Sequence, residues 1–383
     1  MVRTPELRVT LVGHYPPPYG GVATLLVDME AALAAAGCTL SVFNLSGGRA
    51  SGERVRNFDR GNRVRQVLEL RRAFASEDAD VFHCVSASYR SFWMAALCLA
   101  LAKAARKRMV LSFVGGAFPA FLRSLDPIRA VLARAVLARA DALIPCSGDI
   151  AAVLEEFAPG RVGPVVTNAF RAVAAPAGPL PAEVLHFVRG HEPVVCTTAG
   201  PAPEYGLLGA LDAVARLRGK HPRIGFVLVL TRYGNAEHER EVSARIGTLG
   251  LRDHVLVTRD LPDFLALLGA ADAFLRSTLV DGDSMSVREA LAVGVPVAAS
   301  DTPFRPEGVV LFRRGDAEDM ARALEECLEV KREAGGGAAA GRVPSAPGPR
   351  GRGAGASDET GTNLATLLSV YRTVVESGPR RGR

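Results

Sequence analysis

Short apolar runs alternate with helix-like segments along most of this chain. In its first part, six such runs are rich in β-branched and other apolar side chains, at 9–13, 40–44, 80–85, 109–114, 142–147 and 165–168. Segments with apolar residues at helical spacing lie between some of them, at 23–36 and 126–139. Continuous apolar strands are typical of a parallel sheet that helices cover on both faces. The pattern therefore predicts a doubly wound, Rossmann-like α/β domain over residues 1–171.

A stretch rich in Pro and Ala, AVAAPAGPLPAE, then interrupts the pattern, and we expect a linker over 172–190. The alternation restarts after it, with apolar runs at 194–200, 225–230, 254–261, 273–277, 296–300 and 309–312. Helical patterns alternate with these runs, at 207–218, 236–249, 264–271 and 316–330. A second doubly wound domain is therefore predicted over 191–331. Two such domains create a cleft, and strands of this type present ligands at their carboxyl ends.

The C-terminal part has a different composition. Residues 333–361 are mostly Gly, Ala, Pro and Arg without periodicity, so we expect a disordered insert over 332–362. Residues 363–377 again show helical spacing, with Leu367 and Tyr371 on the apolar side. A helix of this length is marginal in water by itself, so we expect it to dock on a folded domain.

Composition and charge exclude several classes of protein. Apolar residues make up 48% and charged residues 22%, as in a globular protein. The six cysteines are scattered and form no C-x-x-C pair, which argues against a zinc site or a disulfide framework and favours the reducing cytoplasm. The N-terminal segment has no long apolar core, so we do not expect a signal peptide. Most of the net charge of +6 lies in the tail from Lys331, and no basic pattern with interleaved aromatic residues indicates nucleic acid.

The most apolar run, 92–102, leaves two interpretations open. With 11 residues it is too short to cross a bilayer, which requires roughly 20. It is followed by KAARKR, so a helix that touches the inner face of the membrane is one interpretation. A buried domain helix with a basic end is the other and the simpler one.

The segment VDGDSMSVREALAVGVPVAASD, which begins at Val280, carries the densest candidate chemistry. Ser286 and Glu289 have the spacing of a capping box at the start of a helix. Asp281 and Asp283 form an Asp-x-Asp pair, which could hold a divalent metal. Alternatively, the free N–H groups of the first helical turn could bind a phosphate, with Glu289 accepting hydrogen bonds from sugar hydroxyls. The spacing alone leaves these three possibilities open.

This segment resembles the signature of glycosyltransferase family 4, the retaining nucleotide-sugar transferases of the GT-B fold. Two acids stand eight positions apart, at Asp281 and Glu289, and Gly294, Pro296 and Val297 follow at the family's spacing. The resemblance extends over nearly the whole chain, including the Gly20-Gly21 loop. It implies two Rossmann-like domains that face a cleft, with the last helix packed back on the first domain.

The resemblance implies a role for each matching residue. Asp281 and Glu289 would be the catalytic pair, with Glu289 on the nucleotide ribose and Asp281 near the donor sugar. The donor site would comprise Gly20, Gly21, Arg232, Arg259, Leu261, Arg276, Asp283, Ser284, Met285 and Ser286. His83, Gly115 and Gly116 would contact the acceptor or the sugar. No metal and no cofactor is implied, since the nucleotide-diphosphate sugar is itself the donor substrate.

Two departures from the family pattern stand out. The family places an Arg and a Lys after the first strand of the second domain, but the stretch 200–206, GPAPEYG, has neither. Arg232, Arg276 and Arg305 follow other strands, and we expect Arg276 to substitute because it directly precedes the signature. Val114 stands where relatives often have a His before Gly-Gly, and His83 is a candidate replacement.

The function expected from the resemblance is metal-independent transfer of a sugar to an acceptor hydroxyl with retention. The acceptor could be a polysaccharide, a lipid carrier or a small metabolite. Three alternatives stay open: a metal-dependent transferase that uses the Asp-x-Asp pair, an epimerase or hydrolase on the same frame, and a degenerate protein that binds sugar nucleotide without turnover.

Overall fold

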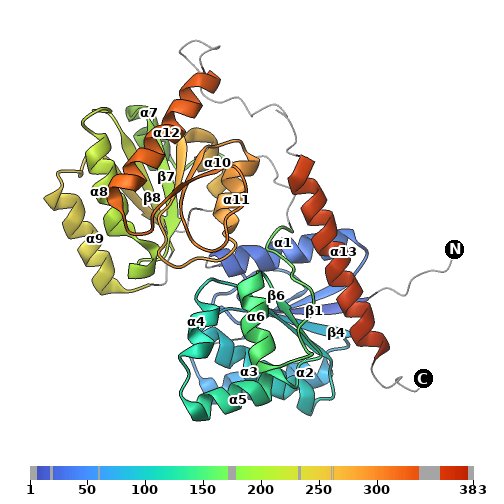
Figure 1. The fold of residues 1–383 in the computed structure, drawn as a ribbon. Helices are drawn as coiled ribbons and strands as arrows, with labels where there is room; N and C mark the ends of the chain where they lie inside the picture. The colour runs from blue at the N-terminus through green and yellow to red at the C-terminus, as the bar shows by residue number, and fades with distance from the viewer. Residues whose placement is uncertain are drawn as a thin grey trace. The chain divides into compact units, whose positions relative to one another are not determined.

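The computed structural model describes residues 7–17, 20–58, 61–170, 178–231, 234–259, 261, 263–335 and 354–377. The chain divides into two compact units (Figure 1). The first unit contains Met1–Arg171 together with Ser357–Arg383, and the second contains Ala172–Ala356. Each unit is built on its own parallel sheet of six strands.

The sheet of the first unit has the strand order β3-β2-β1-β4-β5-β6. Its strands are β1 (Arg8–Gly13), β2 (Thr39–Asn44), β3 (Val55–Asn57), β4 (Val81–Ser86), β5 (Met109–Phe113) and β6 (Ala142–Pro145). Val9 of β1 is in register with Leu40 of β2 and with Val81 of β4. Strands β1, β4, β5 and β6 are almost entirely buried, which explains their continuous apolar sequences.

In the described part of this unit, seven helices pack around the sheet: α1 (Gly21–Ala35), α2 (Arg63–Ser76), α3 (Arg90–Ala104), α4 (Phe118–Arg123), α5 (Pro127–Leu137), α6 (Gly148–Phe157) and α13 (Ala354–Glu376). Asp126 caps α5 by accepting a hydrogen bond from the Arg129 N–H, and Pro127 occupies the first helical position, as the sequence predicts. Helix α3 packs on β4 and β5 and lies between α2 and α5 (Figure 1).

Helix α13 packs on the first unit although it follows the second unit in the chain. Its Tyr371 is fully buried and lies 2.5 Å from the His83 ring of β4. Its Asn363 donates hydrogen bonds to the Thr167 hydroxyl at 2.8 Å and to the Ala169 carbonyl at 3.0 Å. These contacts stabilise α13, because an isolated helix is marginal in water.

The sheet of the second unit has the order β12-β11-β10-β7-β8-β9. Its strands are β7 (Val194–Ala199), β8 (Gly225–Leu230), β9 (Val255–Arg259), β10 (Ala273–Arg276), β11 (Val297–Ser300) and β12 (Val309–Phe312). The helices are α7 (Ala182–Gly190), η1 (Pro203–Tyr205), α8 (Leu207–Leu217), α9 (Ala236–Thr248), α10 (Phe264–Ala270), α11 (Met285–Ala292) and α12 (Ala317–Gly335). Two apolar clusters, one on each face of the sheet, form the core.

The prediction of two doubly wound α/β units is confirmed, and four local predictions need correction. Residues 182–190 of the expected linker form α7, because Val184 is buried in the core of the second unit. Helix α13 starts at Ala354, nine residues before the predicted start, and α12 continues to Gly335. The remainder of the expected disordered insert, 336–353, lies outside the described residues. The run 165–168 forms no strand.

The apolar run 92–102 lies in α3, and most of its apolar side chains are buried. Phe92, Cys98 and Leu99 are 0–1% exposed, so this part of the helix belongs to the core of the first unit. The simpler interpretation of this run is therefore correct for its inner face. Among the described residues, no helix is long and apolar enough to span a membrane.

Candidate functional site

The second unit brings polar side chains together where β7 and β10 lie side by side. β7 leads through α8 to β8 on one side, whereas β10 leads through α11 to β11 on the other. The loops after these two neighbouring strands therefore diverge, and this is the topological switch point where doubly wound sheets bind ligands. We define the switch-point cluster as Thr198, Arg276, Thr278, Asp281, Ser300 and Arg305.

Arg276, the last residue of β10, joins the two strands at this point. Its Nε and Nη2 donate to the two Asp281 carboxylate oxygens at 2.8 and 2.9 Å. Its Nη1 donates to the Thr198 carbonyl of β7 at 3.1 Å. This bidentate geometry suits a guanidinium, whose planar fork matches a carboxylate.

Arg305 reaches the same carboxylate from the loop after β11. Its Nη1 donates to Asp281 Oδ2 at 2.8 Å, and its Nη2 lies 3.1 Å from the Thr278 hydroxyl. Its Nε donates to the Ser300 carbonyl at 2.9 Å. Two arginines therefore share a single aspartate, and the three side chains together carry a formal charge of +1.

Burial makes these charges strongly interdependent. The side chains of Arg276, Asp281 and Arg305 are 13%, 10% and 4% exposed. Burial alone raises the pKa of Asp281, but the two guanidiniums outweigh it and hold the pKa at about 2. Burial lowers the pKa of Arg305, and Asp281 partly offsets this effect. Asp281 is thus ionised at neutral pH and fixes the positions of both arginines.

The segment 200–206, which lacks the two expected cations, packs directly against the cluster. The Arg276 guanidinium lies over the Tyr205 ring, 5.7 Å from its centroid. The Ser277 hydroxyl donates to the Tyr205 carbonyl at 2.8 Å. Gly206 has a φ of +65°, and a Cβ there would lie 2.2 Å from the Ser277 carbonyl oxygen, so only glycine fits. Arg276 thus brings a positive charge to this segment.

Helix α11 begins at Met285, with Ser284 at its N-cap. The Ser284 side chain makes no capping hydrogen bond and instead lies 3.1 Å from the Ser286 hydroxyl. Ser286 is inside the helix rather than at its cap, so the capping-box interpretation of Ser286 and Glu289 is wrong. The buried Asp283 carboxylate accepts a hydrogen bond from Arg288 Nε at 2.5 Å. Met285 and Glu289 are half-buried on α11.

Two described residues of the expected donor site lie away from the strand ends that form the switch-point cluster. Arg259 ends the edge strand β9 and pairs with Glu239 of α9. Leu261 is buried in the apolar core. Arg232 lies outside the described residues.

In the first unit, two glycine pairs follow β1 and β5, the strands on either side of β4, near the corresponding switch point between β1 and β4. Gly20 and Gly21 precede and open α1, and a Cβ at either position meets no atom within 4 Å. Gly115 and Gly116 follow β5, and Gly115 has a φ of +94°, which favours glycine. Space for a close backbone approach therefore exists at Gly20 and Gly21 within this unit.

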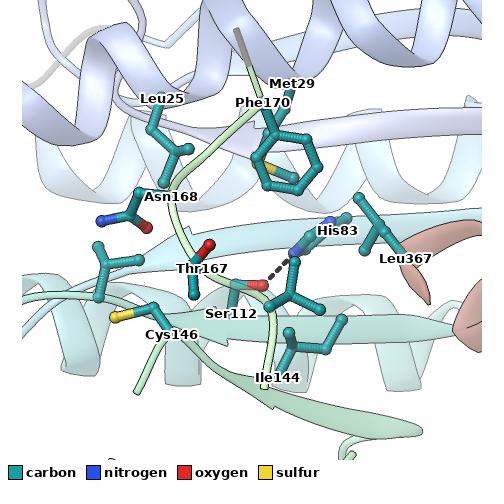
Figure 2. A pocket seen from close by; sticks show the side chains of 12 residues that line it. Leu25, Met29, His83, Ser112, Ile144, Cys146, Thr167, Asn168, Phe170 and Leu367 are labelled. Carbon is teal, nitrogen blue, oxygen red and sulfur yellow. Dashed lines mark hydrogen bonds between the residues drawn. The ribbon is translucent and has the colours of Figure 1, made fainter. Parts of the chain in front are cut away.

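His83 lies in the interior of the first unit rather than on its surface. One ring nitrogen lies 2.6 Å from the Ser112 hydroxyl (Figure 2), and the other lies 2.5 Å from the Tyr371 hydroxyl. Burial lowers its pKa to about 3, so the imidazole is neutral. The cavity beside it has a free volume of about 10 Å³, which is about enough for one water molecule. The surroundings of His83 are those of a structural residue that anchors α13.

Sequence reasoning missed some members of the switch-point cluster. Thr278 and Ser300 gave no motif signal, although each lies at or just after the carboxyl end of a strand. Tyr205 was noted in the sequence only as part of 200–206, the segment that lacks the two expected cations. Within the described residues, no group of three or more His, Cys, Asp or Glu side chains is arranged to hold a metal ion.

Comparison with known proteins identifies the family of this chain. The family model for Glycosyltransferase Family 4 matches residues 19–165, and the model for Glycosyl transferases group 1 matches residues 192–330. Between them these matches cover most of both units. The chain therefore belongs to the glycosyltransferases that these two family models describe. No curated protein matches it in sequence.

Solved structures with the same fold include HepE, a sucrose-phosphate synthase and the catalytic domain of a starch synthase. HepE of Anabaena in complex with UDP-glucose has a TM-score of 0.67 and 15% identity, over 97% of this chain and 99% of that one. Sucrose-phosphate synthase of Thermosynechococcus elongatus has a TM-score of 0.68 and 17% identity, over 97% and 100%. The catalytic domain of starch synthase IV of Arabidopsis thaliana, bound to ADP and acarbose, has a TM-score of 0.68 and 13% identity, over 97% and 100%. At these identities the similarity establishes the GT-B fold.

Proposed function

We propose that this glycosyltransferase moves a hexose or related sugar from a nucleoside-diphosphate donor to an acceptor hydroxyl, with retention and without a metal ion. The observation that carries the proposal is the switch-point cluster, in which Arg276 and Arg305 share Asp281 and leave one net positive charge. Departure of a nucleoside diphosphate develops negative charge, and preorganised cations stabilise that charge without reorganisation.

The neighbouring helix supports the same assignment. The first N–H groups of α11 follow Ser284, whose side chain does not cap them. Such N–H groups and the positive end of the helix dipole favour an anion. Glu289, one turn further on, would accept hydrogen bonds from the ribose. Asp281 then acts as a positioning residue for two arginines, a different role from the one that the resemblance implies.

The ion pairs also favour a metal-independent reaction over the Asp-x-Asp alternative. Both oxygens of Asp281 accept hydrogen bonds from guanidiniums, and Asp283 Oδ1 accepts one from Arg288. A divalent ion between these carboxylates would have to displace arginines from buried pairs, at a cost in desolvation. The arginines supply the positive charge that a metal supplies elsewhere.

Retention is proposed from the resemblance to family 4. In that mechanism the acceptor attacks on the face that the leaving group vacates, and the diphosphate takes the acceptor proton. The work of the protein is then to orient the two substrates and to neutralise the leaving group. We propose a nucleotide-sugar donor in general terms, because the similar structures contain UDP-glucose in one case and ADP in another.

The test is a calorimetric titration of the protein with UDP-, GDP-, ADP- and dTDP-glucose, repeated with Arg276→Gln. We expect one donor to bind and the variant to bind it at least about tenfold more weakly. Arg322→Gln is the matched control, because Arg322 is an exposed arginine of the same unit. Absence of binding for the whole panel, or equal binding by Arg276→Gln, would contradict the proposal. Activity that EDTA abolishes would refute metal independence.

A second candidate is a protein that binds the sugar nucleotide without turnover. It is favoured by the absence of cations in 200–206 and by Val114 before Gly115. Measuring donor consumption beside donor binding separates the two. Free sugar released in the absence of an acceptor would instead indicate a hydrolase, and interconversion of sugar nucleotides an epimerase.

A further inference from the structure

The helix layer formed by α2, α3 and α5 exposes large apolar side chains on the first unit. Ile128, Val131 and Leu132 of α5 are 83%, 65% and 51% exposed, and Val64 and Leu68 of α2 are 71% and 46% exposed. An exposed leucine or valine is ordinary by itself, but a group of them on adjacent helices indicates an interaction surface.

The spacing on α5 shows that this helix has two apolar faces. Ala133 and Leu137 are buried against the unit. Ile128, Val131 and Leu132, at positions i, i+3 and i+4, form a second stripe that faces solvent. A helix that is apolar on both sides is expected where both sides are covered. The outer stripe of α5 has no such cover within the described residues of this chain.

Helix α3 joins the two exposed stripes. It lies between α2 and α5 (Figure 1), and it has no charged residue between Arg90 and Lys103. Met94, Leu97 and Leu101, which share one side of this helix, are only half-buried. The apolar surface therefore continues across the layer from α2 to α5.

The same three helices carry a large surplus of positive charge. They contain eight Arg or Lys and one Glu, a formal charge of +7, whereas the entire chain has +6. The single Glu69 pairs with Arg65 at 2.8 Å, which leaves three other arginines on α2 without an acid on that helix. Arg134 of α5 lies over the Phe157 ring at 4.6 Å. Lys103 of α3 and Arg129 of α5 pair with Asp141 and Asp126, which lie outside these helices, so the surplus charge beside the apolar stripes rests mainly on the arginines of α2.

We propose that the α2–α3–α5 surface docks on an anionic lipid membrane. Apolar side chains between arginines match the interface of a bilayer, where the chains enter the acyl boundary and the guanidiniums reach acidic headgroups. Arginines near such a surface are attracted by its negative potential, within about one Debye length. The surface belongs to the first unit, so the proposal is independent of the donor site in the second unit.

The test measures sedimentation of the full chain with vesicles of phosphatidylglycerol or of phosphatidylcholine. We expect binding to the anionic vesicles only, and release when NaCl rises from about 50 to about 500 mM. The triple variant Ile128→Gln, Val131→Gln, Leu132→Gln should bind at least about tenfold more weakly, since Gln keeps the helix propensity but removes the apolar contact. Arg71→Gln with Arg72→Gln should also weaken binding and flatten its dependence on salt.

The matched control is Leu311→Gln with Val330→Gln, which changes two exposed apolar residues of the second unit. It should bind vesicles like the wild type, and circular dichroism should give all variants similar melting temperatures. The proposal is overturned if the wild-type protein ignores anionic vesicles at low salt, or if the triple variant binds them equally well. It is also overturned if sedimentation velocity shows a dimer that the triple variant abolishes, since the surface would then bind a second copy of the chain.

Discussion

The Arg276 guanidinium donates hydrogen bonds to both carboxylate oxygens of Asp281, at 2.8 and 2.9 Å. This pair ties the end of β10 to the loop that leads into α11. Because Arg305 joins the same carboxylate at 2.8 Å, the aspartate is surrounded by more positive charge than it can balance. An anion bound beside Arg276 and Arg305 would neutralise the remaining positive charge. The Arg276–Asp281 pair is therefore part of the proposed donor site.

Arg276→Gln should reduce kcat/KM for the donor by about 10²–10³-fold, the range for loss of one preorganised group that stabilises developing charge. The reason is that the leaving diphosphate loses a cation that is already in place. Steady-state kinetics with the donor found by calorimetry measures the effect. Arg322→Gln should keep wild-type values, and an equal loss in that control would show that the effect is not specific to the site.

Asp281→Asn should remove the part of the pH dependence of the unfolding free energy that comes from titration of the Asp281 carboxylate. The folded-state pKa of Asp281 is about 2, below the usual value of about 3.9. The carboxylate therefore stabilises the fold above pH 4, and this contribution disappears as the pH falls from about 4 to about 2. Its size is on the order of 2 kcal/mol. Urea unfolding at pH 6 and at pH 3 should show a wild-type advantage that shrinks toward the lower pH, and a constant difference would contradict this account.

Glu289→Gln should weaken donor use by more than about tenfold with little change in the folded structure. A carboxylate accepts hydrogen bonds from ribose hydroxyls more strongly than an amide does. Kinetics at varied donor concentration should show the loss mainly in kcat/KM, and circular dichroism should stay unchanged. Unchanged kinetics would remove Glu289 from the proposed site.

Gly20→Ala should lower activity while leaving stability within about 0.5 kcal/mol of the wild type. A Cβ at Gly20 meets no atom within 4 Å, and the φ of 171° is extended backbone that alanine adopts. Any loss therefore comes from a ligand that must approach this backbone closely. Thermal unfolding and kinetics measured together check the prediction. Gly269→Ala, at another open position in the second unit, is the control and should keep full activity.

His83 should make the fold sensitive to mild acid. Its pKa in the folded state is about 3, against about 6.5 for an exposed imidazole. Below pH 6.5 the unfolded chain therefore takes up a proton that the folded chain does not, and stability falls until about pH 3. From pH 7.5 to pH 5 this costs about 2 kcal/mol. His83→Gln should lose less stability over this range than the wild type, and NMR should show that the ring does not titrate above pH 5.

Alternation of strand and helix signals sufficed to predict two doubly wound units, because the period of apolar residues reflects local backbone geometry. The same logic missed α7 and α2. The Pro and Ala residues around α7 are typical of a linker, and the helix is stabilised by packing of Val184 rather than by its local sequence. α2 is polar overall and buries Leu70 and Phe74, a pattern that its many arginines obscure.

The sequence by itself determined the fold class and singled out the segment from Asp281 to Glu289, since both depend on residues close together in the chain. Only the tertiary structure decided that Arg276 and Arg305 meet at one aspartate, that His83 is buried against Tyr371, and that α2, α3 and α5 place exposed apolar and basic side chains side by side. Each of these relationships joins residues that are far apart in sequence or on different elements. Strand order and helix packing bring them together, and no local pattern encodes that.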